Sequence, residues 1–191
     1  MLTLFEGGDD LPVSLEDLKR HCRVDFDDDD DVLGIYLRSA VEYVARETGR
    51  TLAPSVWLVR RPGFGSGCID IPLAPLRDVV EMTIIDGSGE RVVVDGWSWR
   101  RTPAGGAVEV APGHDWPAAD AVEIEVEAGY DLAGASGSGD DPELRLPVRL
   151  RLAVLMLAGH WYENREAVSD SVKAKLPLGV EKLLGQMKVF R

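Results

Sequence analysis

The sequence predicts an α+β protein that is mainly an α-helical bundle of two long and two short helices, with a small antiparallel β module inserted between them. Three observations favour this class. Apolar residues recur at helical spacing within residues 29–48. From Pro54 the apolar period changes to two, which is typical of strands. Residues 152–158 are apolar nearly all round, as expected for a central helix that is covered on several sides.

Two helices are predicted before the β module. Ser14 begins a short helix, with Asp17 at the reciprocal capping position. A long helix follows over residues 29–48, and Gly49 ends it because glycine readily adopts the left-handed conformation of a helix C-cap. The acidic run 27–31 stands at the start of this helix, where the helix dipole stabilises negative charge.

Strand patterns fill the predicted β module. Residues 122–127 alternate between apolar and acidic side chains, which indicates one buried and one solvent-facing side of a sheet. Residues 86–89 read as a hairpin turn. The prolines of this region exclude long helices. The expected strands are 56–61, 68–71, 79–86, 91–94, 107–110 and 122–127.

The C-terminal part returns to a helical pattern after a glycine- and serine-rich loop at 134–141. A long helix is expected over 147–166, a short one over 177–186, and an amphipathic tail over 187–191. These boundaries give three segments, of which the helical parts form one domain: N-terminal helices 1–54, β module 55–131, and C-terminal helices and tail 132–191.

Charge is spread unevenly along the 191 residues, whose net charge is −12. Residues 142–191 carry 9 basic and 5 acidic side chains, whereas the rest of the chain is acidic. An acidic surface repels phosphate, so general binding to duplex DNA is not expected. The basic end favours contact with an acidic surface, such as another copy of the chain, and the alternative is a chance bias of solvated residues. The longest apolar run is far shorter than a membrane span of ~20 residues, so no membrane partner is expected.

The sequence contains no motif that supports catalysis, and we expect no enzyme, no metal and no cofactor. A calcium loop starting at Asp27 fails because Val32 and Arg38 stand where glycine and glutamate are required. The glycine-rich segment 63–67 lacks the helix and the lysine of a phosphate loop. The three histidines and two cysteines are not at metal-binding spacing.

Aromatic residues of the β module leave one ligand-binding alternative open. The module contains four tryptophans: Trp57, Trp97, Trp99 and Trp116. Such residues can stack on a sugar, but they more often fill the core of a small sheet.

Five segments, in a fixed order, resemble one known family. They are IPLAPLRDV at 71–79, DGSGE at 86–90, AGY at 128–130, HWYENRE at 160–166 and LPLGVEKLL at 176–184. Each is unspecific alone, but their order and spacing resemble the head–tail connector (adaptor, or head-completion) proteins of tailed phages and gene transfer agents.

The resemblance implies a non-enzymatic ring, usually of twelve copies, that docks on the portal protein below the capsid vertex. The ring joins the portal to a tail-side stopper or terminator protein and leaves an axial channel, which DNA passes without specific binding. The implied location is the neck of a virion or phage-like particle, with assembly in the host cytoplasm. The alternatives are another tail-side ring component, a stopper or a tail terminator, and a ligand-binding module built on the β insertion.

Three sets of candidate residues follow. The C-terminal segment of the family contacts the portal, which here implies portal binding by Leu183, Leu184, Met187, Lys188, Val189, Phe190 and Arg191. The basic row, the small glycine and their neighbours are expected at a subunit interface: Arg145, Arg149, Arg151, Gly159, Trp161 and Arg165. The acidic run is expected to line a channel or the outer surface: Asp27, Asp28, Asp29, Asp30 and Asp31.

Overall fold

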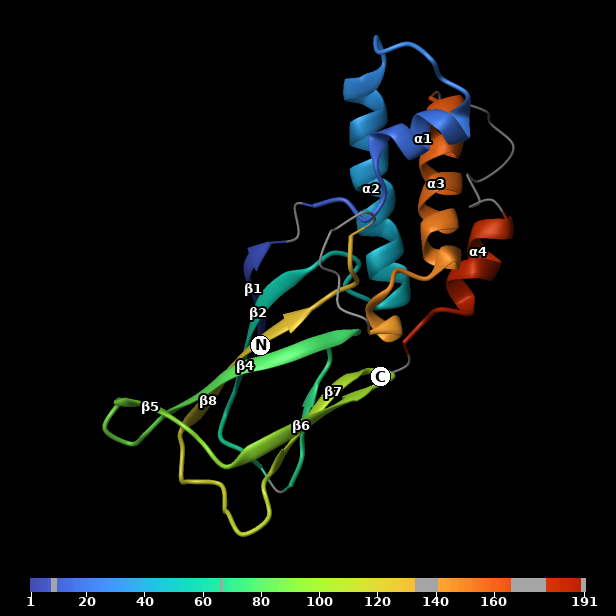
Figure 1. Ribbon diagram of the computed structural model, residues 1–191. Helices are drawn as coiled ribbons and strands as arrows, with labels where there is room; N and C mark the ends of the chain where they lie inside the picture. The colour runs from blue at the N-terminus through green and yellow to red at the C-terminus, as the bar shows by residue number, and fades with distance from the viewer. Residues whose placement is uncertain (8–9, 66, 133–140, 166–177, 190–191) are drawn as a thin grey trace, which may run out of the picture. The chain divides into compact units, whose positions relative to one another are not determined.

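The computed structural model describes residues 1–7, 10–65, 67–132, 141–165 and 178–189 (Figure 1). The chain divides into two compact units. The sheet unit contains the described residues of Met1–Asp10 and Ala53–Tyr130 together with Val189, and the helical unit contains those of Leu11–Leu52 and Asp131–Lys188.

Eight strands form two antiparallel sheets in the described part of the sheet unit. The five-stranded sheet has the order β1 (Leu2–Gly7), β2 (Ser55–Arg61), β8 (Ala121–Ala128), β4 (Leu76–Ile85) and β5 (Arg91–Val93). The three-stranded sheet has the order β3 (Ile69–Ile71), β7 (Gly105–Val110) and β6 (Trp97–Thr102). Strand β8 lies in the centre of the larger sheet, paired with β2 on one side and β4 on the other.

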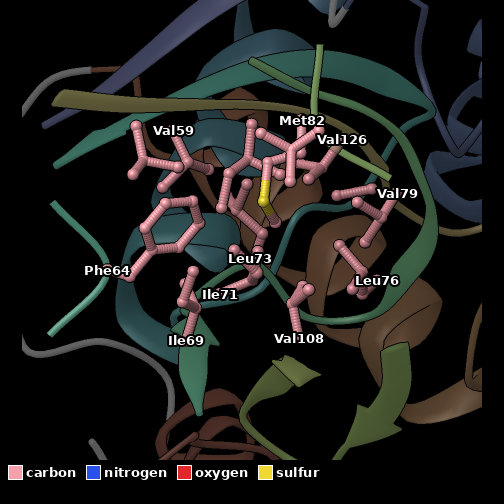
Figure 2. Close-up of a cluster of buried hydrophobic side chains, with 14 of the residues drawn as sticks. Val59, Phe64, Ile69, Ile71, Leu73, Leu76, Val79, Met82, Val108 and Val126 are labelled. Carbon is pink, nitrogen blue, oxygen red and sulfur yellow. The ribbon is translucent and has the colours of Figure 1, made fainter. Parts of the chain in front are cut away.

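The core of this unit is built from the apolar faces of both sheets. Val122, Ile124 and Val126 of β8 are fully buried in it. Figure 2 shows side chains of the same cluster from other parts of the unit, including Phe64 and Met82. The four tryptophans of the β module pack against this core, which confirms the core-filling interpretation of these residues. The ring of Trp116 stacks on Phe64 with their centroids 4.5 Å apart.

The described part of the helical unit contains α1 (Leu15–Cys22), α2 (Asp30–Thr48), the 3-10 turn η1 (Pro142–Leu144), α3 (Val148–Glu163) and α4 (Leu178–Gly185). Helices α2 and α3 lie side by side (Figure 1). The predicted caps are confirmed: the backbone N–H of Asp17 donates to Ser14 Oγ at 3.1 Å, and Gly49 adopts a φ of 69° at the end of α2. The buried apolar side of α3 includes Leu150, Val154 and Leu157.

The predicted mixed α+β class is confirmed, but its description as mainly helical is not, because strands are about as abundant as helices. The sequence pattern does not predict two of the strands, β1 and β6. All six residues of β1 are exposed, so it lacks the buried alternate face that marks a strand in sequence. In β6 the two tryptophans are followed by polar residues, and a regular apolar repeat is absent.

Several boundaries differ from the predicted ones. Helix α3 ends at Glu163 instead of residue 166, and the strand expected at 79–86 is Leu76–Ile85. The loop expected at 134–141 lies almost entirely outside the described residues, as do Phe190 and Arg191 of the tail.

Gly129 gives a test of the backbone that follows β8. Its φ is +114°, and an added Cβ would lie 2.0 Å from the carbonyl oxygen of Ala53. We expect Gly129→Ala to lower the free energy of unfolding by at least ~2 kcal/mol, measured by urea denaturation, because both strain and a backbone clash result.

Gly34 is the matched control for this substitution. It lies inside α2 with nothing within 4 Å of an added Cβ, so Gly34→Ala should raise the free energy of unfolding by up to ~1 kcal/mol. Equal effects of the two substitutions would contradict the described backbone.

Candidate functional surfaces

Charged and apolar patches on the surface of each unit are the candidate functional sites. Among the described residues, no group of three or more His, Cys, Asp or Glu side chains is arranged to hold a metal ion. No helix within the described part of the chain is long and apolar enough to cross a membrane.

One basic patch lies at the start of α3. Val148 and Leu152, one turn apart, are 79% and 41% exposed. Arg149 is exposed between them, and Arg145 is exposed just before the helix. Within the described residues neither arginine forms an ion pair. We call these four residues the α3 patch: Arg145, Val148, Arg149 and Leu152.

Arg151 belongs to the same predicted basic row but has a partner in its own unit. Its guanidinium lies 2.8 Å from Asp17 Oδ2. The hydrogen bond from the Ser14 hydroxyl lowers the pKa of Asp17, and the positive charge of Arg151 lowers it further. Arg151 thus connects α3 to the first turn of α1.

Gly159 and Trp161 also make contacts inside the helical unit. Gly159 is buried, and a Cβ added there would lie 3.3 Å from the side chains of both His21 and Cys22. The element that lies close to this glycine is therefore α1 of the same chain. The rings of Trp161 and Tyr43 pack edge to face, with their centroids 6.3 Å apart.

The acidic run 27–31, which leads into the first turn of α2, is held by cations of the helical unit. Lys19, whose side chain is only 8% exposed, lies 2.5 Å from Asp27 Oδ1 and 2.7 Å from Asp30 Oδ1. The hydrogen bond from Lys19 lowers the pKa of Asp27, and the bonds to both carboxylates raise the pKa of Lys19. A buried ammonium needs such partners, so these two aspartates have a structural role.

Asp29 makes a second link, to the end of α3. Its Oδ2 accepts hydrogen bonds from the Tyr162 hydroxyl at 2.6 Å and from Arg165 Nη2 at 2.5 Å. The Tyr162 bond, followed by the Arg165 bond, lowers the pKa of Asp29. Asp28 and Asp31 are exposed, and within the described residues neither forms an ion pair. Asp27 is exposed as well but is paired with Lys19, so Asp28 and Asp31 are the members of the predicted acidic set that are exposed and lack an ion pair among the described residues.

The predicted portal-binding segment is anchored to the helical unit as far as Lys188. Leu184 is buried and Leu183 is half-buried. The backbone carbonyl of Met187 accepts a hydrogen bond from Arg50 Nε at 2.9 Å. Lys188 Nζ lies 3.2 Å from Glu47 Oε2. Val189 is half-buried, and Phe190 and Arg191 lie outside the described residues.

The sheet unit carries a groove that the sequence did not predict. It has a volume of about 350 Å³ on the five-stranded sheet. We call it the sheet groove, and it is lined by Phe5, Leu58, Glu81, Thr83, Arg91, Val93, Glu123 and Glu125. The acidic alternation in β8 is the sequence signal for it, but alternation alone predicts only a solvent-facing side. The strand neighbours that turn this side into a groove are fixed by the fold.

Comparison with known proteins adds a family and a set of similar structures. The sequence profile described as phage gp6-like head–tail connector protein matches residues 12–86 and 118–188. The unmatched residues 87–117 include β5, β6 and β7. No curated protein sequence matches the chain.

Three solved structures match along 100% of this chain and 96% of their own chains. The first is the neck of an empty gene transfer agent (GTA) particle computed with C6 symmetry, at 24% identity and a TM-score of 0.77. The second is the virion of a native GTA particle, at 25% identity and a TM-score of 0.77. The third is the neck of a native GTA particle computed with C12 symmetry, at 25% identity and a TM-score of 0.75.

The contacts of Asp29 predict how stability depends on pH. The contacts lower the pKa of Asp29 in the folded chain. The contribution of Asp29 to the free energy of unfolding is therefore complete above the ordinary aspartate pKa of about 4 and is lost as the pH falls below that value. We expect Asp29→Asn to lower the melting temperature at neutral pH, with the difference from the unchanged chain shrinking below a pH of about 4.

The exposed neighbour Asp28 provides the control, since Asp28→Asn makes the same chemical change without these contacts. Melting curves from a pH of about 2.5 to about 7 span the titration of the carboxylate and make the comparison. A constant difference for Asp29→Asn across that range would contradict the described ion pair.

Proposed function

Because the chain belongs to the phage gp6-like head–tail connector family, we propose that it forms a ring that docks on the portal protein, joins the capsid to the tail and leaves an axial channel for DNA. The chain is a structural protein of a phage-like particle, not an enzyme. The observation that carries the proposal is similarity along its whole length to a chain of a GTA neck computed with C12 symmetry. Twelve copies are the proposed ring size.

A closed ring needs two different surfaces on each copy, because each subunit contacts its two neighbours through unlike faces. The α3 patch supports this arrangement, since it is basic, partly apolar and exposed on a chain of net charge −12. We propose Arg145 and Arg149 as subunit-interface residues. The other members of the predicted set would support that interface from within the helical unit: Arg151, Gly159, Trp161 and Arg165.

Portal docking is proposed for the end of the chain. The contacts of Met187 and Lys188 hold the segment that leads to it against α2 and the residues that follow this helix. Residues 189–191 would then bind the portal, for example by strand addition. Leu183 and Leu184 would position this segment through α4.

The channel surface is proposed to be acidic. Asp28 and Asp31 are exposed, so their charge is available to repel DNA phosphates. Asp27, Asp29 and Asp30 would act by holding the acidic segment in place. Such a surface lets DNA pass without binding to it.

Electron microscopy of the purified protein mixed with the portal ring of the same particle tests the proposal. We expect a new annular layer on the narrow end of the portal. A bare portal at micromolar protein and moderate salt would contradict portal docking. Binding to isolated tail parts would then indicate a stopper or a tail terminator.

Removal of residues 189–191 tests the portal contact. We expect the melting temperature to stay the same and the affinity for the portal ring to fall by about ten-fold or more, as for loss of an apolar anchor. Binding is measured by co-sedimentation with portal rings. Lys188→Gln is the control, since it breaks the ion pair with Glu47 and keeps the end of the chain. Equal portal affinity with and without residues 189–191 would refute this contact.

A further inference from the structure

We propose that the sheet groove of one copy receives the α3 patch of the next copy, with Arg149 held between the carboxylates of Glu81 and Glu125. The inference rests on the proposed ring and names the two surfaces that meet in it. Three features carry it: the charge left unbalanced in the groove, the exposed apolar side chains at both surfaces, and the symmetry of a ring.

The groove contains one carboxylate that is already neutralised. Glu123 has a side chain that is only 7% exposed, and it is paired with Arg91 and with Arg60, the latter at 3.5 Å. Arg60 and Arg91, two cations of the same sheet, therefore neutralise Glu123, the most buried carboxylate of the groove. No further cation is needed at this position.

The other two carboxylates lack such a balance. Glu81 on β4 and Glu125 on β8 stand directly opposite each other in the strand register. Glu81 accepts a hydrogen bond from the Thr83 hydroxyl at 3.2 Å, but among the described residues neither glutamate forms an ion pair. Like charges placed directly opposite in a sheet destabilise it. A cation from outside the chain would remove this repulsion.

A second pair of opposed carboxylates lies further along β4 and β8. Asp78 of β4 stands opposite Glu127 of β8. The unbalanced charge is thus a row along two neighbouring strands, and it favours a partner with more than one basic group. The α3 patch supplies Arg149 and Arg145.

Apolar side chains accompany the charges on both surfaces. In the groove, Phe5 is 69% and Val93 is 55% exposed. In the α3 patch, Val148 and Leu152 flank Arg149 on the first two turns of the helix. Contact between the two surfaces would cover all four apolar side chains and would let the planar guanidinium bind carboxylates through paired hydrogen bonds.

A second copy is the occupant that accounts for both surfaces together. Every copy carries one groove and one α3 patch, on different units of the chain. Joining groove to patch leaves a free patch on one side and a free groove on the other, so the contact repeats. A basic segment of another protein in the groove would leave the α3 patch uncovered.

Zero-length crosslinking detects this contact directly. A carbodiimide joins a lysine amine to a carboxylate with loss of water, so the full chain is used with the substitution Arg149→Lys. We expect the introduced lysine to link to Glu81 or Glu125 of another copy, as identified by mass spectrometry after mixing light and heavy isotope-labelled protein. Arg38→Lys, at an exposed position of α2, is the matched control and should give no link to the groove. Absence of the groove links, in solution and in the portal-bound layer, would overturn the proposal.

Charge reversal then tests the energetic role of the pair. Glu125→Lys blocks the groove and Arg149→Glu blocks the patch, so each alone should weaken self-association by about ten-fold or more in sedimentation velocity. A mixture of the two variants still contains one intact groove and one intact patch, so it should associate more strongly than either variant alone. Glu42→Lys, at an exposed position of α2, controls for the change in net charge. A mixture that associates no better than either variant alone would contradict the pairing.

The isolated chain provides an independent readout. Glu125→Gln removes the repulsion from Glu81, so we expect the melting temperature to rise by about 1–2 °C while self-association weakens. A lower melting temperature would contradict unbalanced charge in the groove.

The outcomes for the ring and for this contact can be told apart. If the layer forms on the portal with the groove blocked by Glu125→Lys alone and also with the patch blocked by Arg149→Glu alone, the proposed function stands and this contact is wrong. If the unchanged chain forms no layer, the proposed function fails, and the crosslinks in solution still decide the contact.

Discussion

The alternation of apolar and acidic side chains along β8 is the constraint on which the sheet unit depends. One face of this strand supplies Val122, Ile124 and Val126 to the core. The other face supplies Glu123 and Glu125 to the groove. Because side chains alternate strictly across a strand, the register that buries the apolar residues also fixes the acidic row opposite β4. Folding and the charge of the exposed face are therefore set by the same pairing.

In the helical unit, several charged groups hold elements together. Lys19 binds Asp27 and Asp30, while Arg165 and Tyr162 hold Asp29. These contacts join the acidic run 27–31 to α1 and to the end of α3. The arginines of the α3 patch, by contrast, form no ion pair among the described residues. Arginine thus has a structural role at Arg151 and Arg165, whereas Arg145 and Arg149 form an open surface.

Sequence patterns predicted the elements that have a buried face. The caps of α1 and α2, the central helix and β8 all follow from local periodicity and capping chemistry. Edge strand β1 could not be predicted in this way because its pairing with β2 joins distant parts of the chain. The candidate surfaces show the same limit. The sequence indicated a basic C-terminal region, but only the fold separates Arg149 from Arg151, which is paired with Asp17.

The proposed contact also bears on when a ring would assemble. Copies with a net charge of −12 repel one another, yet this repulsion is screened beyond about 8 Å at physiological ionic strength. The attraction between Arg149 and the two glutamates acts at short range and depends on orientation. Copies held side by side on a portal would already have lost the entropy that association costs, so the short-range pair would decide between neighbours. The net negative charge of the copies would keep their association in solution weak, and the attraction between Arg149 and the two glutamates would stabilise the ring once the copies are held on the portal.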